Sequence, residues 1–260
     1  MKAIILASYG PPESLQVQEV AKPEPADNEV LVRVRAAAVN HIDYEKASGA
    51  MKQVFPLTFP WIPGYDFAGT IEALGTNVVN FAVGDDVYGT STHSGAYAEY
   101  IAIRPEQIAQ KPRTLDFIEA ASVPVSAETA WQVLFEQAHV HEGQTVLIHG
   151  GAGAVGTYAV QFAHQAGAKV IVTASSRARE RVVALGANQV IDYRTEQFET
   201  LVSGVDAVID LVGGPMQQRS YGVIKKGDTW WRSISPFQTI WLINMVFTPF
   251  SSNSVRLRRG

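Results

Sequence analysis

The stretch VLIHGGAGAVGTYAVQFAHQAGAKVIVTASSRARER, residues 146–181, holds a glycine-rich turn between an apolar run and a run with helical periodicity. Its glycines Gly151, Gly153 and Gly156 are spaced as G-x-G-x-x-G. In a strand–turn–helix unit, these positions provide a tight turn, let the main chain approach a pyrophosphate, and let the helix pack closely on the strand. The pattern predicts a dinucleotide site with the pyrophosphate at the helix N-terminus, near Ala154 and Val155. An ordinary tight turn is the alternative.

The end of the second strand indicates which nucleotide binds. In NAD-specific folds of this type, an Asp or Glu about 20 residues further on holds the ribose hydroxyls. Here the strand runs into TASSRARER, whose first acid is Glu180. Ser175, Ser176, Arg177 and Arg179 instead supply hydroxyl and guanidinium groups, which suit a dianionic 2′-phosphate. The sequence therefore favours NADP(H), although the same arginines also suit the solvated first turn of a helix.

Strand-like and helix-like runs alternate around the glycine turn, which predicts right-handed βαβ units on a parallel sheet. The expected strands cover residues 145–149, 169–173, 189–192 and 206–211, and the expected helices lie near 155–166, 179–185 and 216–224. Residues 1 to about 115 differ, because short β-type runs there are separated by Pro, Gly and Asn. That spacing predicts an antiparallel barrel or sandwich with few helices.

Composition and charge limit the classes of function. A chain of 260 residues with 47% hydrophobic and 18% charged residues can bury the cores of two domains. Its net charge of -4 disfavours nucleic acid as a partner. The absence of cysteine excludes disulfides and thiolate zinc sites and suits a reducing compartment. The short apolar run at the N-terminus is unlike a signal peptide, so we expect a cytoplasmic protein.

The composition changes abruptly after Asp228. Residues 229–260 contain no Asp, Glu, Lys or Ala and hold three of the five tryptophans. Residues 229–234 suit a fifth strand, and no later run suits the sixth strand of a doubly wound sheet. We therefore expect a truncated or frameshifted C-terminus that leaves the sheet incomplete and the tail poorly soluble. A surface anchor formed by residues 240–247 and the terminal arginines is the alternative, since that run is too short to span a membrane.

Several motifs together resemble one family. They are VNHID with a following SG (39–43, 48–49), IPGYDFAGTIEALG (62–75), VGDDVYG (83–89), VPVSAETAW (123–131), GGAGAVG (150–156), LGANQVIDY (185–193) and VDAVIDLVGG (205–214). From Met1 to about Asp228 the chain is similar to zinc-free medium-chain dehydrogenase/reductases of the NADPH:quinone oxidoreductase type, related to zeta-crystallin. The resemblance implies a GroES-like catalytic domain over residues 1–117 and an incomplete Rossmann domain, a doubly wound parallel sheet, over 118–228. Residues 229–260 form an atypical tail.

The resemblance also implies NADPH as cofactor, a cleft between the domains for nicotinamide and substrate, and a homodimer. Asn40 and Thr129 are then expected near the nicotinamide or its ribose, and Gly213 and Gly214 beside the nicotinamide. The remaining implied contacts are Ala152 to Gly156 with the pyrophosphate, Ser175 and Arg177 with the 2′-phosphate, and Tyr193 with the adenine ribose-phosphate.

The zinc branch of this superfamily is disfavoured by two residues. Where that branch has its zinc ligands, this chain has Asn40 and Tyr65, and neither is a good ligand for zinc. Hydride transfer to a quinone or an enone needs no metal, because the charge develops on a delocalised oxygen that hydroxyl or amide groups can stabilise. Asn40 and Tyr44 are the candidate catalytic residues. Asn40 also suits a cap of the chain turn, and Tyr44 also suits the cleft wall.

We therefore predict an NADPH-dependent oxidoreductase of quinones, enones or similar conjugated carbonyls. Two alternatives stay open from the sequence: a protein that binds NADPH without turnover, and an alcohol dehydrogenase.

Overall fold

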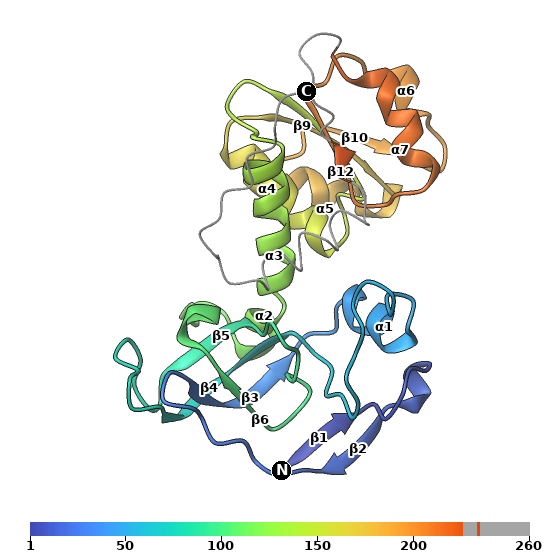
Figure 1. Ribbon diagram of the computed structural model, residues 1–260. Helices are drawn as coiled ribbons and strands as arrows, with labels where there is room; N and C mark the ends of the chain where they lie inside the picture. Colours follow the sequence, from blue (N-terminus) through green and yellow to red (C-terminus); the bar gives the residue numbers. More distant parts are fainter. Residues whose placement is uncertain (226–232, 235–260) are drawn as a thin grey trace, which may run out of the picture.

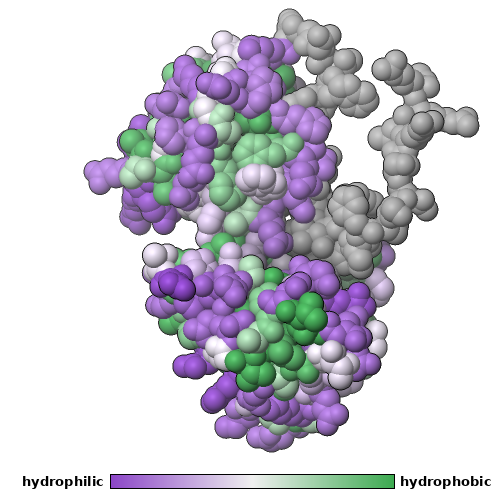
Figure 2. All heavy atoms as spheres, turned by 90° about the vertical axis from the view of Figure 1, so that its left-hand side faces the viewer, coloured by the Kyte–Doolittle hydropathy of each residue, from purple (hydrophilic) through white to green (hydrophobic). Residues whose placement is uncertain are grey.

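The computed structural model describes residues 1–225 and 233–234, which form two bodies with different sheets. The N-terminal body contains antiparallel strands, the C-terminal body contains a parallel sheet with helices on it, and helix α3 lies where the two meet (Figure 1). Figure 2 shows the two bodies separated on one side by an indentation at this level. The α/β plus β architecture expected from the sequence is confirmed.

The N-terminal body is built on a five-stranded antiparallel sheet in the order β6-β3-β4-β5-β7. A second sheet pairs β1 with β2. Val30, Val32, Phe67, Ile71 and Val87 fill the core, because alternate residues of the strands face inward. The strands are β1 Lys2–Ile5, β2 Gln16–Glu19, β3 Val30–Ala37, β4 Asp66–Leu74, β5 Asp86–Thr90, β6 Tyr100–Ile103 and β7 Ile108–Gln110.

Two strands and one helix of this body were not predicted from the sequence. All four residues of β2 are exposed, so its sequence QVQE carries no apolar alternation. Strand β7 has only three residues. Helix α1, His41–Ser48, begins after Asn40, whose main-chain N–H donates to Asp43 Oδ2 at 2.7 Å, and ends at Gly49 with φ 82°. A capping acid three residues after Asn is a helix-start signal that the sequence did contain.

The C-terminal body carries a parallel sheet in the order β10-β9-β8-β11-β12. Numbered from its own first strand, this order is 3-2-1-4-5, which is the order of dinucleotide-binding sheets. The strands are β8 Thr145–His149, β9 Lys169–Ala174, β10 Gln189–Asp192, β11 Ala207–Asp210 and β12 Ser233–Ile234. The helices are α2 Phe117–Ala121 and α3 Pro124–Trp131 at the junction, a π-helical turn Gln132–Gln137, then α4 Ala154–Gln165, α5 Arg179–Ala184, α6 Phe198–Leu201 and α7 Pro215–Ser220.

Both faces of the parallel sheet are covered, which explains why β8 has a nearly continuous apolar sequence. Val146 and Ile148 pack against α4 through Ala159 and Val160, whereas Leu147 packs on the opposite face. The four predicted strands and the three predicted helices are therefore confirmed, and the four-residue α6 is an addition.

The fifth strand expected within residues 229–234 is present as β12, which pairs in parallel with β11. The other predictions for the tail, a missing sixth strand, poor solubility and a surface anchor, concern residues that lie outside the described part of the chain. Within residues 1–225, no helix has the length and the apolar character needed to cross a membrane.

Candidate active site

The glycine turn between β8 and α4 presents main-chain donors. Gly153 is the N-cap residue of α4, and the first helical hydrogen bond runs from Thr157 N–H to the Gly153 carbonyl at 2.9 Å. The N–H groups of Ala154, Val155 and Gly156 have no acceptor among the described residues. Three free N–H groups at the positive end of a helix form an anion site.

The three fingerprint glycines are required for different reasons. A Cβ on Gly156 would lie 2.3 Å from the Gly150 carbonyl oxygen, and a Cβ on Gly151 would lie 2.3 Å from Cγ1 of Val172. These two glycines therefore permit the packing of the helix and strands. A Cβ on Gly153 would meet only the Gly150 oxygen, at 3.3 Å. With space at Gly153 and three N–H groups without an acceptor among the described residues, the residues of this turn fit a bound pyrophosphate.

Arg181, which the sequence analysis did not select, contacts this turn. Its Nη2 donates to the Ala152 carbonyl oxygen at 2.7 Å from helix α5. The contact fixes the direction of one peptide of the turn and adds a cation beside the anion site. The sequence RARER does not show which of its arginines contacts the glycine turn. The packing of α5 beside the turn shows that Arg181 does.

The residues predicted for the 2′-phosphate follow β9. Ser175 is half-buried, and Ser176 and Arg177 are exposed in a short 3-10 helix, Ser176–Ala178. Within the described chain, Arg177 has no ion-pair partner, whereas Arg179 lies 3.8 Å from Glu196. Arg177 is thus the cation of this turn that remains available for a ligand.

An acid from the next strand also reaches this turn. Asp192, at the end of β10, accepts hydrogen bonds from the N–H groups of Ser176 and Arg194, both at 3.0 Å. Asp192 as a whole residue is 7% exposed, and both of its carboxylate oxygens are engaged by these main-chain donors. The neighbouring Tyr193 is 52% exposed, so its ring is accessible from solvent. An acid is therefore present at the end of β9 in space, although none follows β9 directly in the sequence, and its carboxylate is already engaged by main-chain N–H groups.

The loop after β11 lies beside the glycine turn. Strands β8 and β11 are paired, with His149 opposite Asp210. Gly213 and Gly214 have φ values of 78° and 65°, and Asp210 accepts the Gly213 N–H at 2.9 Å. The predicted nucleotide contacts that follow β8, β9, β10 and β11 therefore lie at the carboxyl ends of adjacent parallel strands, where ligands bind in open α/β sheets.

Asn40 is tied to the junction between the bodies by a buried acid. Asn40 Nδ2 donates to Asp66 Oδ2 at 3.0 Å, and Asp66 also accepts the Val125 N–H at the start of α3. Asp66 is fully buried at the first position of β4. It lies in the quoted motif IPGYDFAG, but the sequence analysis assigned it no role.

Thr129 lies on α3, one turn after Val125. The residue is 1% exposed, and its Oγ1 has no hydrogen-bond partner in the described structure. A buried hydroxyl without a partner costs free energy, so its position calls for a polar group that binds there. Thr129 therefore fits the predicted contact with the nicotinamide end of a dinucleotide.

Tyr44 lies in a cluster on α1 with His41 and Glu45. Its hydroxyl lies 3.4 Å from His41 Nε2, with the rings edge to face at 4.4 Å, and His41 also lies 3.5 Å from Glu45. Tyr44 is 45% exposed. The structure thus brings Asn40 and Thr129 together through Asp66 and α3, and it places Tyr44 in a separate cluster on α1.

Two buried acids dominate the electrostatics around Asn40. Burial raises the pKa of Asp43 to about 6 and that of Asp66 to about 7. Asp43 accepts hydrogen bonds from the Tyr97 hydroxyl at 3.0 Å and from the Asn40 N–H. Nearby, Lys46 Nζ donates to the Tyr65 hydroxyl at 2.6 Å, and burial lowers the pKa of this lysine.

The raised pKa of Asp66 predicts a pH dependence of stability. Because its folded-state pKa of about 7 lies above the ordinary aspartate value of 3.8, the proton binds the folded state more tightly. The resulting stabilisation is complete below pH 3.8 and is lost as the pH rises through about 7. Between pH 3.8 and about 7, the Asp66 contribution lowers the free energy of unfolding of the parent by about 1.4 kcal/mol per pH unit, and Asp66→Asn should remove this contribution. Urea unfolding of both proteins at several pH values measures the difference.

Asp43 contributes with the same sign up to its pKa of about 6, and His149, whose burial lowers its pKa to about 4, contributes with the opposite sign. Both are present in parent and variant, so they cancel to first order in the difference. Parallel curves of unfolding free energy against pH would show that Asp66 stays ionised throughout.

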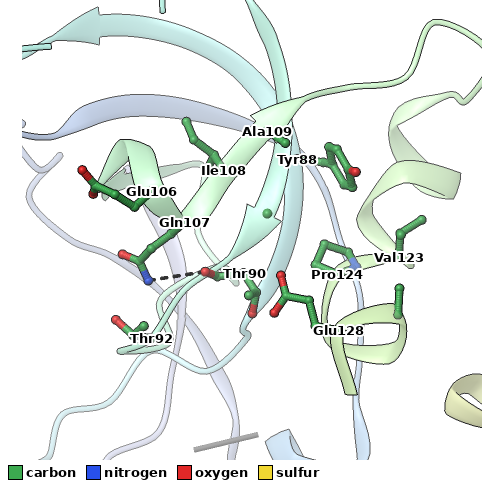
Figure 3. Close-up of a pocket in the computed structure, with 12 residues that line it drawn as sticks. Tyr88, Thr90, Thr92, Glu106, Gln107, Ile108, Ala109, Val123, Pro124 and Glu128 are labelled. Carbon is green, nitrogen blue, oxygen red and sulfur yellow. Dashed lines mark hydrogen bonds between the residues drawn. The ribbon is translucent and has the colours of Figure 1, made fainter. Parts of the chain in front are cut away.

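A separate pocket of about 310 Å³ opens between the N-terminal sheet and α3 (Figure 3). Glu128 and Pro124 line it from α3, and Thr90 and Gln107 line it from the sheet side, with Gln107 Nε2 3.5 Å from the Thr90 carbonyl oxygen. None of the residues predicted to contact the nucleotide lines this pocket. Among the described residues, no group of three His, Cys, Asp or Glu could hold a metal ion.

Comparison with known proteins agrees with this two-body architecture and its glycine turn. Residues 26–113 match the family described as "Alcohol dehydrogenase GroES-like domain", and residues 154–230 match "Zinc-binding dehydrogenase". The 2-methylene-furan-3-one reductase of Solanum lycopersicum is 38% identical over 239 residues, which cover 87% of this chain and 60% of the relative.

Two solved structures share the fold. The quinone oxidoreductase from Coxiella burnetii has 42% identity and a TM-score of 0.79, covering 86% of this chain and 73% of that one. The Escherichia coli quinone oxidoreductase complexed with NADPH has 29% identity and a TM-score of 0.79, covering 87% and 71%. Fold and site define a dinucleotide-binding protein with a GroES-like first body. The chain belongs to the medium-chain dehydrogenase/reductase family.

Proposed function

We propose that this protein is an NADPH-dependent oxidoreductase that reduces a quinone, an enone or a similar conjugated carbonyl. The observation that carries the proposal is the set of three N–H groups of Ala154, Val155 and Gly156, which have no acceptor among the described residues and lie in the turn where Gly153 leaves space. The relatives support the reaction by name, one as a methylene-furanone reductase and one as a quinone oxidoreductase with NADPH. The chain spans about 60% of the length of the Solanum relative, so the activity is proposed for this chain and not transferred to it.

The coenzyme, when bound, supplies the hydride. The main-chain N–H groups at the start of α4 hold its pyrophosphate, and Arg177 with Ser175 and Ser176 holds the 2′-phosphate. Tyr193 lies against the adenine ribose-phosphate, and Gly213 and Gly214 leave room for the nicotinamide. NADPH is preferred because Arg177 has no ion-pair partner among the described residues and because Asp192 is buried and accepts hydrogen bonds from main-chain donors.

At the reacting end, Asn40 and Thr129 bind the nicotinamide or its ribose. Tyr44 offers a half-exposed hydroxyl to the substrate, whose oxygen gains negative charge as the conjugated system is reduced. Asn40 is held by Asp66, whereas Tyr44 is 45% exposed and its hydroxyl contacts only His41 Nε2, at 3.4 Å, among the described residues, so we assign the substrate contact to Tyr44. We further propose the division at residues 117 and 228, a cytoplasmic location and a homodimer, each of which stays a prediction.

The test is turnover in a protein already shown to bind NADPH. We expect NADPH oxidation with a benzoquinone, a naphthoquinone or an open-chain enone, and none with a saturated ketone. Dialysis against a chelator should leave the rates unchanged, since no metal takes part. NADPH binding without turnover on the whole panel would favour the non-enzymatic alternative, and alcohol oxidation that stops with the chelator would favour an alcohol dehydrogenase.

A further inference from the structure

Helix α3 begins without a local cap. Its N-cap residue is Val123, which has no side-chain hydrogen bond, and its first helical residue is Pro124, which has no N–H. The first main-chain donor that needs a partner is therefore the Val125 N–H. It donates to Asp66 Oδ1 at 3.1 Å and lies 3.2 Å from Oδ2. Asp66 thus caps α3 from strand β4, 59 residues earlier in the sequence.

The same carboxylate orients Asn40. Asp66 Oδ2 accepts from Asn40 Nδ2 at 3.0 Å and Oδ1 accepts from the Val125 N–H at 3.1 Å, so both carboxyl oxygens face donors. Asn40 must therefore turn its NH2 group toward Asp66 and its carbonyl oxygen away from it. The Asp66 carboxyl group lies at the N-terminus of α3, where the helix dipole favours a negative charge.

Asp66 accepts hydrogen bonds from Asn40 and from the Val125 N–H of α3, and both lie at the proposed nicotinamide end of the site. Val125 and Thr129 are four residues apart on α3 and share one face of the helix. We infer that Asp66 is a positioning residue that fixes Asn40 and Thr129 relative to each other, so that both contact the nicotinamide end of the coenzyme. Asp66 itself is fully buried and acts only through these neighbours. The inference rests on the proposed function for the identity of the bound molecule.

Swapping the amide and the carboxylate between positions 40 and 66 tests the inference, through Asn40→Asp, Asp66→Asn and the double variant. Asn40→Asp places a second carboxylate 3.0 Å from Asp66 and should weaken NADPH binding about tenfold or more. Asp66→Asn alone keeps one acceptor oxygen, at the Oδ2 position that lies 3.0 Å from Asn40 Nδ2 and 3.2 Å from the Val125 nitrogen. Its NH2 group then meets the Val125 N–H, so this variant should bind NADPH about threefold to tenfold more weakly than the parent. The double variant restores a donor and an acceptor in the reversed direction, so its affinity should return to within about threefold of Asp66→Asn.

The measurements are NADPH titration, the unfolding free energy of the coenzyme-free protein and hydrogen exchange at the Val125 amide. Glu72→Gln is the matched control, since Glu72 is an exposed acid of the same strand that pairs with Lys22, and it should change nothing at the site. A double variant that recovers stability but binds NADPH as weakly as Asn40→Asp would make Asp66 merely structural and overturn the inference. So would an Asn40→Asp variant that binds as tightly as the parent.

The stability cycle separates this inference from the proposed function. A parent protein that binds no NADPH contradicts the proposed function and, with it, the positioning of the coenzyme. In that case, recovery of stability in the double variant would still confirm the link from Asn40 through Asp66 to α3, and failure to recover would remove the link as well.

Discussion

Gly153→Val is expected to abolish NADPH binding while the protein stays folded. Among the described residues, a Cβ at this position meets only the Gly150 oxygen, at 3.3 Å, so the turn accommodates it with a shift of a few tenths of an ångström. The two added methyl groups would fill the space from which a pyrophosphate reaches the N–H groups of α4. Loss of two or more charge-assisted hydrogen bonds, each about 1.5–3 kcal/mol, lowers the affinity more than a hundredfold. Fluorescence titration with NADPH measures the loss.

Two other glycines calibrate this result. Gly222→Val makes the same change where no atom lies within 4 Å of the new Cβ, and its affinity should equal that of the parent. Gly156→Val should instead destabilise the C-terminal body, because its Cβ would lie 2.3 Å from the Gly150 oxygen and 2.6 Å from Gly151 Cα. Normal NADPH affinity in a folded Gly153→Val protein would mean that the phosphates bind elsewhere.

Arg177→Ala is expected to weaken NADPH binding by about 1.5–3 kcal/mol, which is roughly 10- to 150-fold, and to leave NADH binding unchanged. The reason is that Arg177 has no ion-pair partner in the described chain and can meet the 2′-phosphate, which NADH lacks. The ratio of the two dissociation constants, measured by titration, reports this contact alone.

Arg179→Ala is the matched control for that prediction. Arg179 is two residues further on and lies 3.8 Å from Glu196, so its removal should affect stability slightly and selectivity little. If the selectivity falls in Arg179→Ala and not in Arg177→Ala, the assignment of the 2′-phosphate to Arg177 is wrong. If neither variant changes it, Arg181, which donates to the Ala152 carbonyl, becomes the next candidate.

The predictions that held from sequence are those carried by local patterns. Strand β8 and helix α4 are read from an apolar run followed by 3.6-residue periodicity, and the glycines between them are needed for steric reasons that depend on nearby atoms. Strand β2 was not predicted in this way, because all its residues are exposed and its sequence has no apolar pattern. Its pairing with β1 decides its conformation.

The amino-acid sequence by itself determined the alternation of strands and helices around the glycine turn, the turn itself, the lack of thiolate ligands and the set of hydroxyl and guanidinium groups after β9. These features depend on residue type and short-range spacing. The tertiary structure alone decided which of these groups are available: Asp192 is occupied by main-chain donors, Arg179 is paired, and Arg177 is left unpaired in the described chain. It also decided that Asp66 joins Asn40 to α3. Hydrogen bonds between residues 26 and 59 positions apart depend on how the sheet and helices pack, which no local pattern records.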